Sequence, residues 1–437
     1  MWCLISLVIG FWGICNCDSS NDALKSVLVL TENVWIKDSH SIFLRQITES
    51  GYQLTIRVAD DSSLTLMKYG EYLYKHIILL APSVTEFGGT VSVKELVKFV
   101  DEGGNVIVAG SKDIGEAIRE IGVECGVEFD EMGTAVIDHH NYDITDDGTH
   151  TKVVVAAENL IKNPIIIGNA SKSGLLYRGV GISSDPANPL LISVLRASRT
   201  AYSYSPSRSV TDYPNSVGTN THLIVALQAR NNARVLFLGS LDFLSNEFFR
   251  SPVKNALSGV QSSVSGNKQL MDNLVPWVFG ERGQLRVAGV EHHLAKQHLI
   301  PSQYTIMDEV YYSIIIETKS DSGDWVPFKA DDVQLEFVRI DPFIRRTLEF
   351  KDGKYSTVLR LPDVYGVFKF VVDYHRVGYT HLISVQQVPV RPFTHTQYER
   401  FIVAAYPYYF SAISMLVGVV LFTFIFLYYR DEKEKSD

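Results

Sequence analysis

Cysteine is scarce in this chain, with four residues in 437. Three of them, Cys3, Cys15 and Cys17, lie at the extreme N-terminus, so removal of an N-terminal leader would leave only Cys125. One remaining thiol cannot form an internal disulfide. We therefore expect the folded domains to be held by core burial and by contacts with partners.

Basic clusters and phosphate-binding loops are also missing. The net charge is -9 and no run of Lys and Arg stands out, so nucleic acid is not an expected partner. Neither G-x-G-x-x-G nor G-x-x-x-x-G-K-[ST] occurs, and residues 168–174 carry glycines at the wrong spacing for either motif. The sequence therefore predicts no cofactor-binding residue.

The usual arrangements of a nucleophile or a metal site are absent as well. Two turns, Gly110-Ser111 and Gly239-Ser240, follow apolar runs, but neither has the glycine that a nucleophile elbow carries two residues after its Ser. Cys125 follows a helical segment and is interpreted as an inert core thiol. We predict no catalytic residue from these patterns.

Two histidine groups are candidate metal ligands. They are His139-His140, after Asp138, and His292-His293, after Glu291, with His298. Adjacent side chains on a strand point to opposite faces, and no H-E-x-x-H or C-x-x-C motif accompanies them. Surface histidines are the favoured interpretation, and no metal site is predicted.

The N-terminus has the pattern of a signal peptide over residues 1–17. Its apolar stretch, residues 4–14, is too short to cross a bilayer, and small residues at Cys15 and Cys17 favour cleavage after Cys17. No Lys or Arg precedes the apolar stretch, which leaves an uncleaved anchor or a buried strand as alternatives.

A transmembrane helix is predicted over residues 406–429. No charged residue lies between Arg400 and Arg430, and residues 410–427 would form about 27 Å of apolar helix at ~1.5 Å per residue, with tyrosines on both sides. Ser411, Ser414 and Gly418 share one face, which we expect to pack on a partner helix rather than face lipid only.

The C-terminal tail, residues 430–437, carries a retrieval motif. Lys433 and Lys435 are the fifth and third residues from the end, in the K-x-K-x-x pattern that is read on the cytosolic side of the endoplasmic reticulum membrane. Together with the leader and the helix, it predicts a single-pass type I membrane protein of the endoplasmic reticulum, with a luminal N-terminal region and a cytosolic C-terminus.

Three luminal domains are expected between the leader and the helix. Apolar strands alternate with helices in residues 25–140 and again in residues 142–280, which predicts two α/β domains with parallel sheets. Residues 284–395 show short strands without helical periodicity and predict a C-terminal β-sandwich. Asn169 starts an N-x-[ST] sequon after an apolar run, so both a glycosylated and a buried, unmodified Asn169 remain possible.

Several of these segments resemble the DDOST family of non-catalytic oligosaccharyltransferase subunits. The matching residues are 27–32, 81–82 with 87–89, 239–240 with 245–246, 388–395 with 398–401, and the dilysine tail. The resemblance implies a complex that transfers oligosaccharide from dolichyl diphosphate to Asn of Asn-x-Ser/Thr. In that family an STT3-type subunit performs the chemistry, and ribophorins and a DAD-type small subunit are further partners. An accessory, assembly-stabilising subunit is therefore the expected function.

Two other classes of function compete with it. An independent luminal hydrolase or amidotransferase-like enzyme would be supported by Cys125 in a pocket with His and Glu. A cell-surface receptor is the other, and the dilysine tail argues against it.

Overall fold

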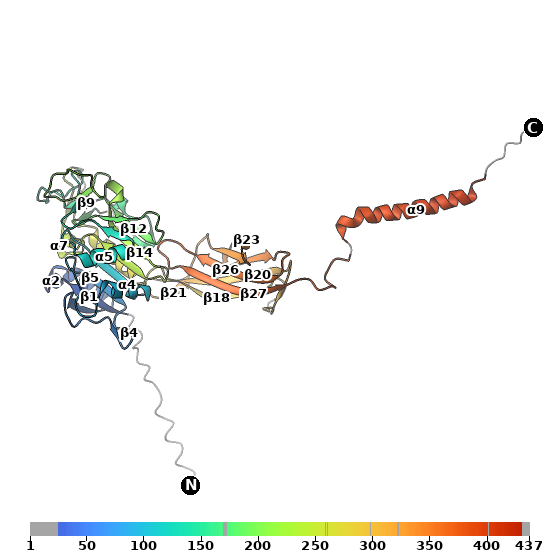
Figure 1. Cartoon of the computed structure of the whole chain (residues 1–437), viewed down its shortest axis with the longest axis horizontal. Helices are drawn as coiled ribbons and strands as arrows, with labels where there is room; N and C mark the ends of the chain where they lie inside the picture. Colours follow the sequence, from blue (N-terminus) through green and yellow to red (C-terminus); the bar gives the residue numbers. More distant parts are fainter. Residues whose placement is uncertain are drawn as a thin grey trace, which may run out of the picture.

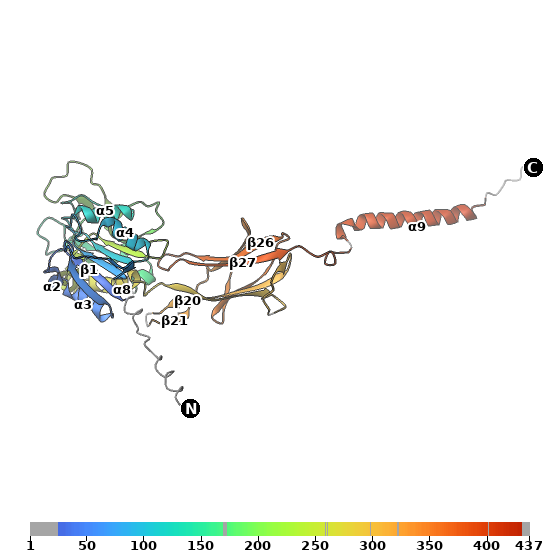
Figure 2. The same cartoon turned by 60° about the horizontal axis from the view of Figure 1, so that its bottom comes forward.

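The computed structural model describes residues 25–168, 173–257, 259, 261–297, 299–320, 323–400 and 402–430. The predicted signal peptide, Asn169, Lys433 and Lys435 lie outside these residues. The described chain forms an α/β head, a β-sandwich and a separate apolar helix that follow one another along one axis (Figure 1, Figure 2).

A nine-stranded sheet forms the centre of the head, in the order β2-β1-β5-β6-β15-β14-β11-β7, with β12 also paired to β14. The first five strands of this order are parallel, and the others join antiparallel. Their bounds are β1 Ser26–Thr31, β2 Gln53–Val58, β5 His76–Leu80, β6 Asn105–Ala109, β7 Val127–Phe129, β11 Ile182–Ser184, β12 Leu191–Arg196, β14 His222–Gln228 and β15 Arg234–Leu238.

This sheet contains strands from both segments that were expected to form separate α/β domains. β15 pairs in parallel with β6, with Val235 opposite Val106, and β11 pairs with β7. The α/β class is confirmed, but the two segments together form one mixed sheet instead of two separate parallel sheets. Apolar strands buried on both faces look alike in sequence, so the pattern indicates a strand without indicating its neighbour.

Helices cover both faces of the sheet (Figure 2). Because side chains alternate along a strand, Val27 and Val29 of β1 lie in one core with α3, α7 and α8, whereas Leu28 and Leu30 lie in the other with α4 and α5. The helices are α3 Ser41–Glu49, α4 Val93–Asp101, α5 Glu116–Glu124, α7 Asn246–Arg250 and α8 Asn267–Val278. Ser92 caps α4, since its hydroxyl accepts a hydrogen bond from the Glu95 N–H at 3.3 Å.

The head also contains short strands and helical turns outside the central sheet. The strands are β3 Met67–Lys68, β4 Glu71–Tyr72, β8 Ala135–Ile137, β9 Val153–Val155, β10 Leu175–Tyr177, β13 Tyr202–Tyr204, β16 Val253–Lys254 and β17 Gln261–Ser262. The helical turns are α2 Ile36–Ser39, α6 Pro164–Ile167, η1 Ala157–Asn159, η2 Gly218–Asn220 and η3 Asp242–Leu244.

The predicted β-sandwich is present, with two five-stranded sheets packed on one core. Phe337 of one strand stacks on Phe368 of another, with ring centroids 4.6 Å apart. One sheet contains β18 Leu285–Leu294, β20 Glu309–Lys319, β21 Trp325–Pro327, β24 Glu349–Lys351 and β25 Lys354–Arg360. The other contains β19 Tyr304–Thr305, β22 Gln334–Val338, β23 Pro342–Thr347, β26 Gly366–Tyr374 and β27 Leu382–Arg391.

The loop between β26 and β27 forms hydrogen bonds with residues of the head. The Gly378 carbonyl accepts a hydrogen bond from Trp277 Nε1 at 2.8 Å, and the Tyr379 carbonyl accepts one from Gln228 Nε2 at 2.8 Å. Asn163 Nδ2 donates to the Val377 carbonyl at 2.7 Å. The head and the sandwich are therefore joined by hydrogen bonds, of which the Trp277–Gly378 bond is buried, as well as by the chain itself.

The last described element is the apolar helix α9 Tyr406–Tyr428, preceded by η4 Val403–Ala405. Within Val403–Tyr428, an 18-residue stretch has a mean hydropathy of 2.5 and none of that stretch is buried within the described structure, so by length and composition the helix can cross a membrane. The Ser414 hydroxyl donates to the Ser411 carbonyl at 2.9 Å, which satisfies it within the helix. Packing of this face on a partner stays a prediction.

Candidate functional site: a polar cavity at the carboxyl ends of the parallel strands

A cavity of about 440 Å³ lies where four parallel strands of the head end. Glu32 follows β1, Ser83 comes shortly after β5, Ser111 follows β6, and Asp242 follows β15. In open α/β sheets, this edge is where ligands bind. We call this space the polar cavity. Its other polar lining residues are Lys112, Asp113, Asp147, Thr149, Thr151 and Arg178.

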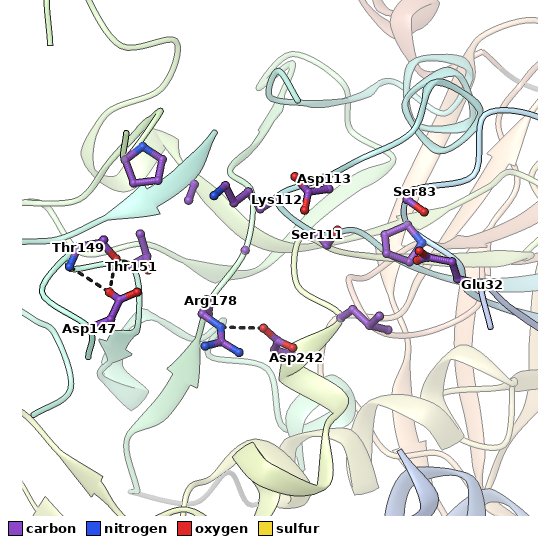
Figure 3. A pocket seen from close by; sticks show the side chains of 15 residues that line it. Glu32, Ser83, Ser111, Lys112, Asp113, Asp147, Thr149, Thr151, Arg178 and Asp242 are labelled. Atoms are coloured by element: carbon purple, nitrogen blue, oxygen red, sulfur yellow. Dashed lines mark hydrogen bonds and ion pairs between the residues drawn. The ribbon is translucent and has the colours of Figure 1, made fainter. Parts of the chain in front are cut away.

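Charges of both signs meet in the polar cavity (Figure 3). Arg178 Nε lies 2.8 Å from Asp242 Oδ2, and both side chains are about half exposed, so this ion pair is worth at most about 1 kcal/mol. Hydrogen bonds from the Thr149 hydroxyl and then from its backbone N–H hold the pKa of the Asp147 carboxyl below its ordinary value. The cavity therefore presents ionised carboxylates together with cationic side chains.

The two Gly-Ser turns differ in their surroundings. Ser111 lines the polar cavity. Ser240 is fully buried, and its hydroxyl donates to the Arg178 carbonyl at 2.6 Å and accepts from the Phe243 N–H at 3.1 Å. A nucleophilic serine needs an adjacent base, and none of the residues lining the cavity is a histidine. The hydroxyl of Ser240 thus fixes the turn into η3 and is not available for attack.

Cys125 lies away from the polar cavity. It caps the C-terminus of α5 and packs partly buried against the core beneath α4 and α5. Burial, with smaller contributions from Asp101 and Glu124, raises the pKa of the Cys125 thiol to about 12. Because the thiolate is the reactive form, this thiol is chemically quiet near neutral pH.

The histidine pairs have structural partners. His139 Nε2 lies 2.9 Å from the Tyr202 hydroxyl, and His292 Nδ1 lies 2.8 Å from the Tyr304 hydroxyl. Burial and then His293 lower the pKa of His292. Over the described ranges, no group of three or more His, Cys, Asp and Glu side chains is arranged to hold a metal ion.

Sequence reasoning did not identify the polar cavity as a site. Asp147 and Arg178 come from loops far apart in the chain, and only folding brings them opposite Lys112 and Asp242. One signal was available from position in the sequence. Glu32 directly follows the buried apolar strand β1, and Ser111 follows the buried apolar strand β6 after one glycine. Parallel strands place such residues on one edge.

Comparison with known proteins identifies the family. The model for the OST48 N-terminal domain matches residues 19–281, and the model for the OST48 middle domain matches residues 292–430. The chain is 55% identical over 411 residues to the dolichyl-diphosphooligosaccharide--protein glycosyltransferase 48 kDa subunit of Danio rerio, covering 94% of this chain and 93% of that protein. It is 53% identical over 433 residues to the Drosophila melanogaster protein of the same name, covering 98% and 96%. The chain belongs to the OST48 family.

Proposed function

We propose that this chain is the non-catalytic, assembly-stabilising subunit of an oligosaccharyltransferase complex. The observation that carries the proposal is the extent of the family match, which includes the head, the sandwich and the apolar helix. Relatives at 50 to 55% identity are named as one subunit of a glycosyltransferase. The complex transfers oligosaccharide from dolichyl diphosphate to Asn of Asn-x-Ser/Thr in nascent proteins.

The chemistry of the polar cavity supports an accessory role. Glycosyl transfer to an amide needs a stabilised diphosphate leaving group and an activated amide, commonly through a metal held by clustered carboxylates. Here Asp242 faces Arg178 and Asp147 accepts hydrogen bonds from Thr149. In addition, one membrane helix does not form an enclosed cavity for a dolichol-linked substrate. We assign the transfer step to an STT3-type partner subunit.

The competing hypothesis was an independent hydrolase or amidotransferase-like enzyme with Cys125 as its nucleophile. It required the thiol in a pocket with a histidine and a glutamate. Cys125 is instead a helix cap with a raised pKa, and it does not line the polar cavity. The accessory role is therefore the better supported of the two.

The shape of the chain suits a connecting role. The head and the sandwich are held together by the loop between β26 and β27, and α9 follows the sandwich at the far end (Figure 1). Such a chain offers two large surfaces outside the membrane and one helix inside it. We expect ribophorins to bind outside the membrane and a DAD-type small subunit to contact α9.

The location is part of the proposal: a type I protein of the endoplasmic reticulum membrane, with Lys433 and Lys435 as the retrieval signal. A reporter that carries this tail should stay in the endoplasmic reticulum, and a Lys433→Ser, Lys435→Ser reporter should reach the Golgi, as judged by glycan processing. Retention of the double variant would contradict the assignment. A reporter separates the tail from retention by partner subunits.

Isolation of the native assembly tests the function. An affinity tag placed on this chain should recover an STT3-type subunit and N-glycosylation activity from detergent-solubilised membranes. Depletion of the chain should lower both the recovered complex and cellular N-glycosylation, because assembly fails. Recovery of the chain without any oligosaccharyltransferase subunit would contradict the proposal.

A further inference from the structure

A second cavity, of about 460 Å³, lies at the opposite end of the same parallel strands. Lys25 precedes β1, Lys75 precedes β5, and Arg234 opens β15. The sandwich supplies the facing wall, with Lys319 at the end of β20 and Thr380 in the loop between β26 and β27. We call this space the junction cavity, because both the head and the sandwich line it.

The junction cavity is strongly basic. Lys25, Lys75, Lys319 and Arg234 line it, and Glu281 is its one acidic lining residue. Within the described part of the chain, none of the three lysines forms an ion pair with a carboxylate, and Lys75 Nζ donates only to the Gly103 carbonyl, at 2.9 Å. An unneutralised group of cations around one cavity favours an anionic ligand.

Glu281 offsets only one of these positive charges. It interacts with the Tyr52 hydroxyl, and burial, followed by the nearby Glu281 charge and hydrogen bond, raises the pKa of Tyr52 well above its ordinary value. Four cationic side chains face one carboxylate, so the cavity keeps an excess of positive charge.

Arg234 is the most unusual member of the cavity wall. It is fully buried, its guanidinium lies 4.5 Å from the Trp277 ring centroid, and it donates to the carbonyls of Trp277, Arg282 and Gly378. Burial lowers the pKa of Arg234 to about 9. Its Nε atom is buried without a hydrogen-bond partner among the described residues. A buried cation without an anion is costly, so a bound anion would relieve an existing penalty.

We propose that the junction cavity binds a small diphosphate, either free or carried by an organic molecule. Its volume falls in the range of about 300–1,000 Å³ that holds small ligands. Arg and Lys are the side chains that recognise phosphate oxygens. A ligand held between Lys75 of the head and Lys319 of the sandwich would stabilise the junction. This inference does not depend on the oligosaccharyltransferase assignment.

The test is a calorimetric titration of inorganic pyrophosphate into the full chain in detergent, without added metal. The expected result is saturable binding with one site, weakened about tenfold or more by Lys75→Gln and by Lys319→Gln. Lys112→Gln, which removes a lysine of the polar cavity, serves as the matched control and should bind as the unmodified chain does. Far-UV circular dichroism verifies that each variant is folded.

Adenosine diphosphate forms the second arm of the experiment. Binding of both ligands supports a diphosphate site with room for an organic group, and binding of pyrophosphate alone supports a site for the free anion. Absence of saturable binding by either, or binding that Lys75→Gln and Lys319→Gln leave unchanged, would overturn the proposal.

Discussion

Replacement of Trp277 by Phe should weaken the junction between the head and the sandwich. The indole Nε1 donates to the Gly378 carbonyl at 2.8 Å, and the Arg234 guanidinium lies 4.5 Å from the centroid of the indole ring. Loss of a buried hydrogen bond costs about 1–3 kcal/mol, and a desolvated cation–π contact is worth about 2 kcal/mol, of which Phe retains a part. We expect Trp277→Phe to lower the free energy of unfolding by about 3 kcal/mol.

A second tryptophan provides the matched control. The Arg286 guanidinium lies 4.1 Å from the centroid of the Trp325 ring, but Trp325 is only half-buried, at the edge of the sandwich. Trp325→Phe should cost less than about 1 kcal/mol. Urea unfolding of the full chain in detergent, followed by far-UV circular dichroism, measures both variants. Equal losses would refute the claim that the buried contacts of Trp277 hold the junction.

Three further predictions concern the helix, a buried histidine and the Gly-Ser turn. Ser414→Leu and Gly418→Leu should reduce co-purification of small membrane subunits, since close helix packing needs small residues, whereas Val420→Leu on the opposite face should not. Burial and then Arg196 lower the pKa of His222 from 6.5 to about 4. As the pH falls from 6.5 towards 4, the unfolded state therefore binds a proton before the folded state does, and the free energy of unfolding should decrease. His222→Gln should make the urea midpoint less sensitive to a change from pH 7 to 5, and an unaltered sensitivity would argue against this assignment. Ser240→Ala leaves a buried N–H and carbonyl without a partner and should cost about 1–3 kcal/mol in urea unfolding, with no loss of transfer by the assembled complex.

Local structure was largely readable from the sequence. The one-sided apolar pattern of residues 92–102 predicts a helix, and α4 forms there, because this pattern and the Ser92 cap specify a helix without long-range information. The apolar pattern of residues 241–249 predicts one helix, whereas the structure divides this segment into η3 and α7. Ser245 causes the break, since its hydroxyl accepts from the Phe248 N–H and starts a new helix.

Long-range arrangement was not readable in the same way. The Ser, Tyr and Pro content of residues 198–221 predicts a long loop, yet this segment contains β13, which pairs with β8 from more than 60 residues earlier in the chain. Proline disfavours a strand interior, yet Pro389 lies within β27, opposite Val367. Pairing partners depend on which apolar faces meet after collapse, and neither periodicity nor turn residues encode this.

The two cavities show the same limit for sites. Ser111 and Ser240 both follow Gly after an apolar strand, but this shared pattern does not show that Ser111 lines a cavity and Ser240 is buried. The basic residues of the junction cavity are separated widely in sequence and form no run. Composition therefore gave no indication of a local excess of positive charge in an acidic chain.

The most direct test of the accessory role is the transfer rate of an assembled complex that carries variants of this chain. Asp147→Asn removes a carboxylate of the polar cavity, and Cys125→Ala removes the thiol. His292→Ala removes the imidazole that contacts the Tyr304 hydroxyl. Transfer to an Asn-x-Ser/Thr peptide, normalised to the amount of assembled complex, should stay close to that of the unmodified complex. A well-assembled variant that loses two orders of magnitude in rate, about 2.7 kcal/mol of barrier, would show that this chain supplies a catalytic residue.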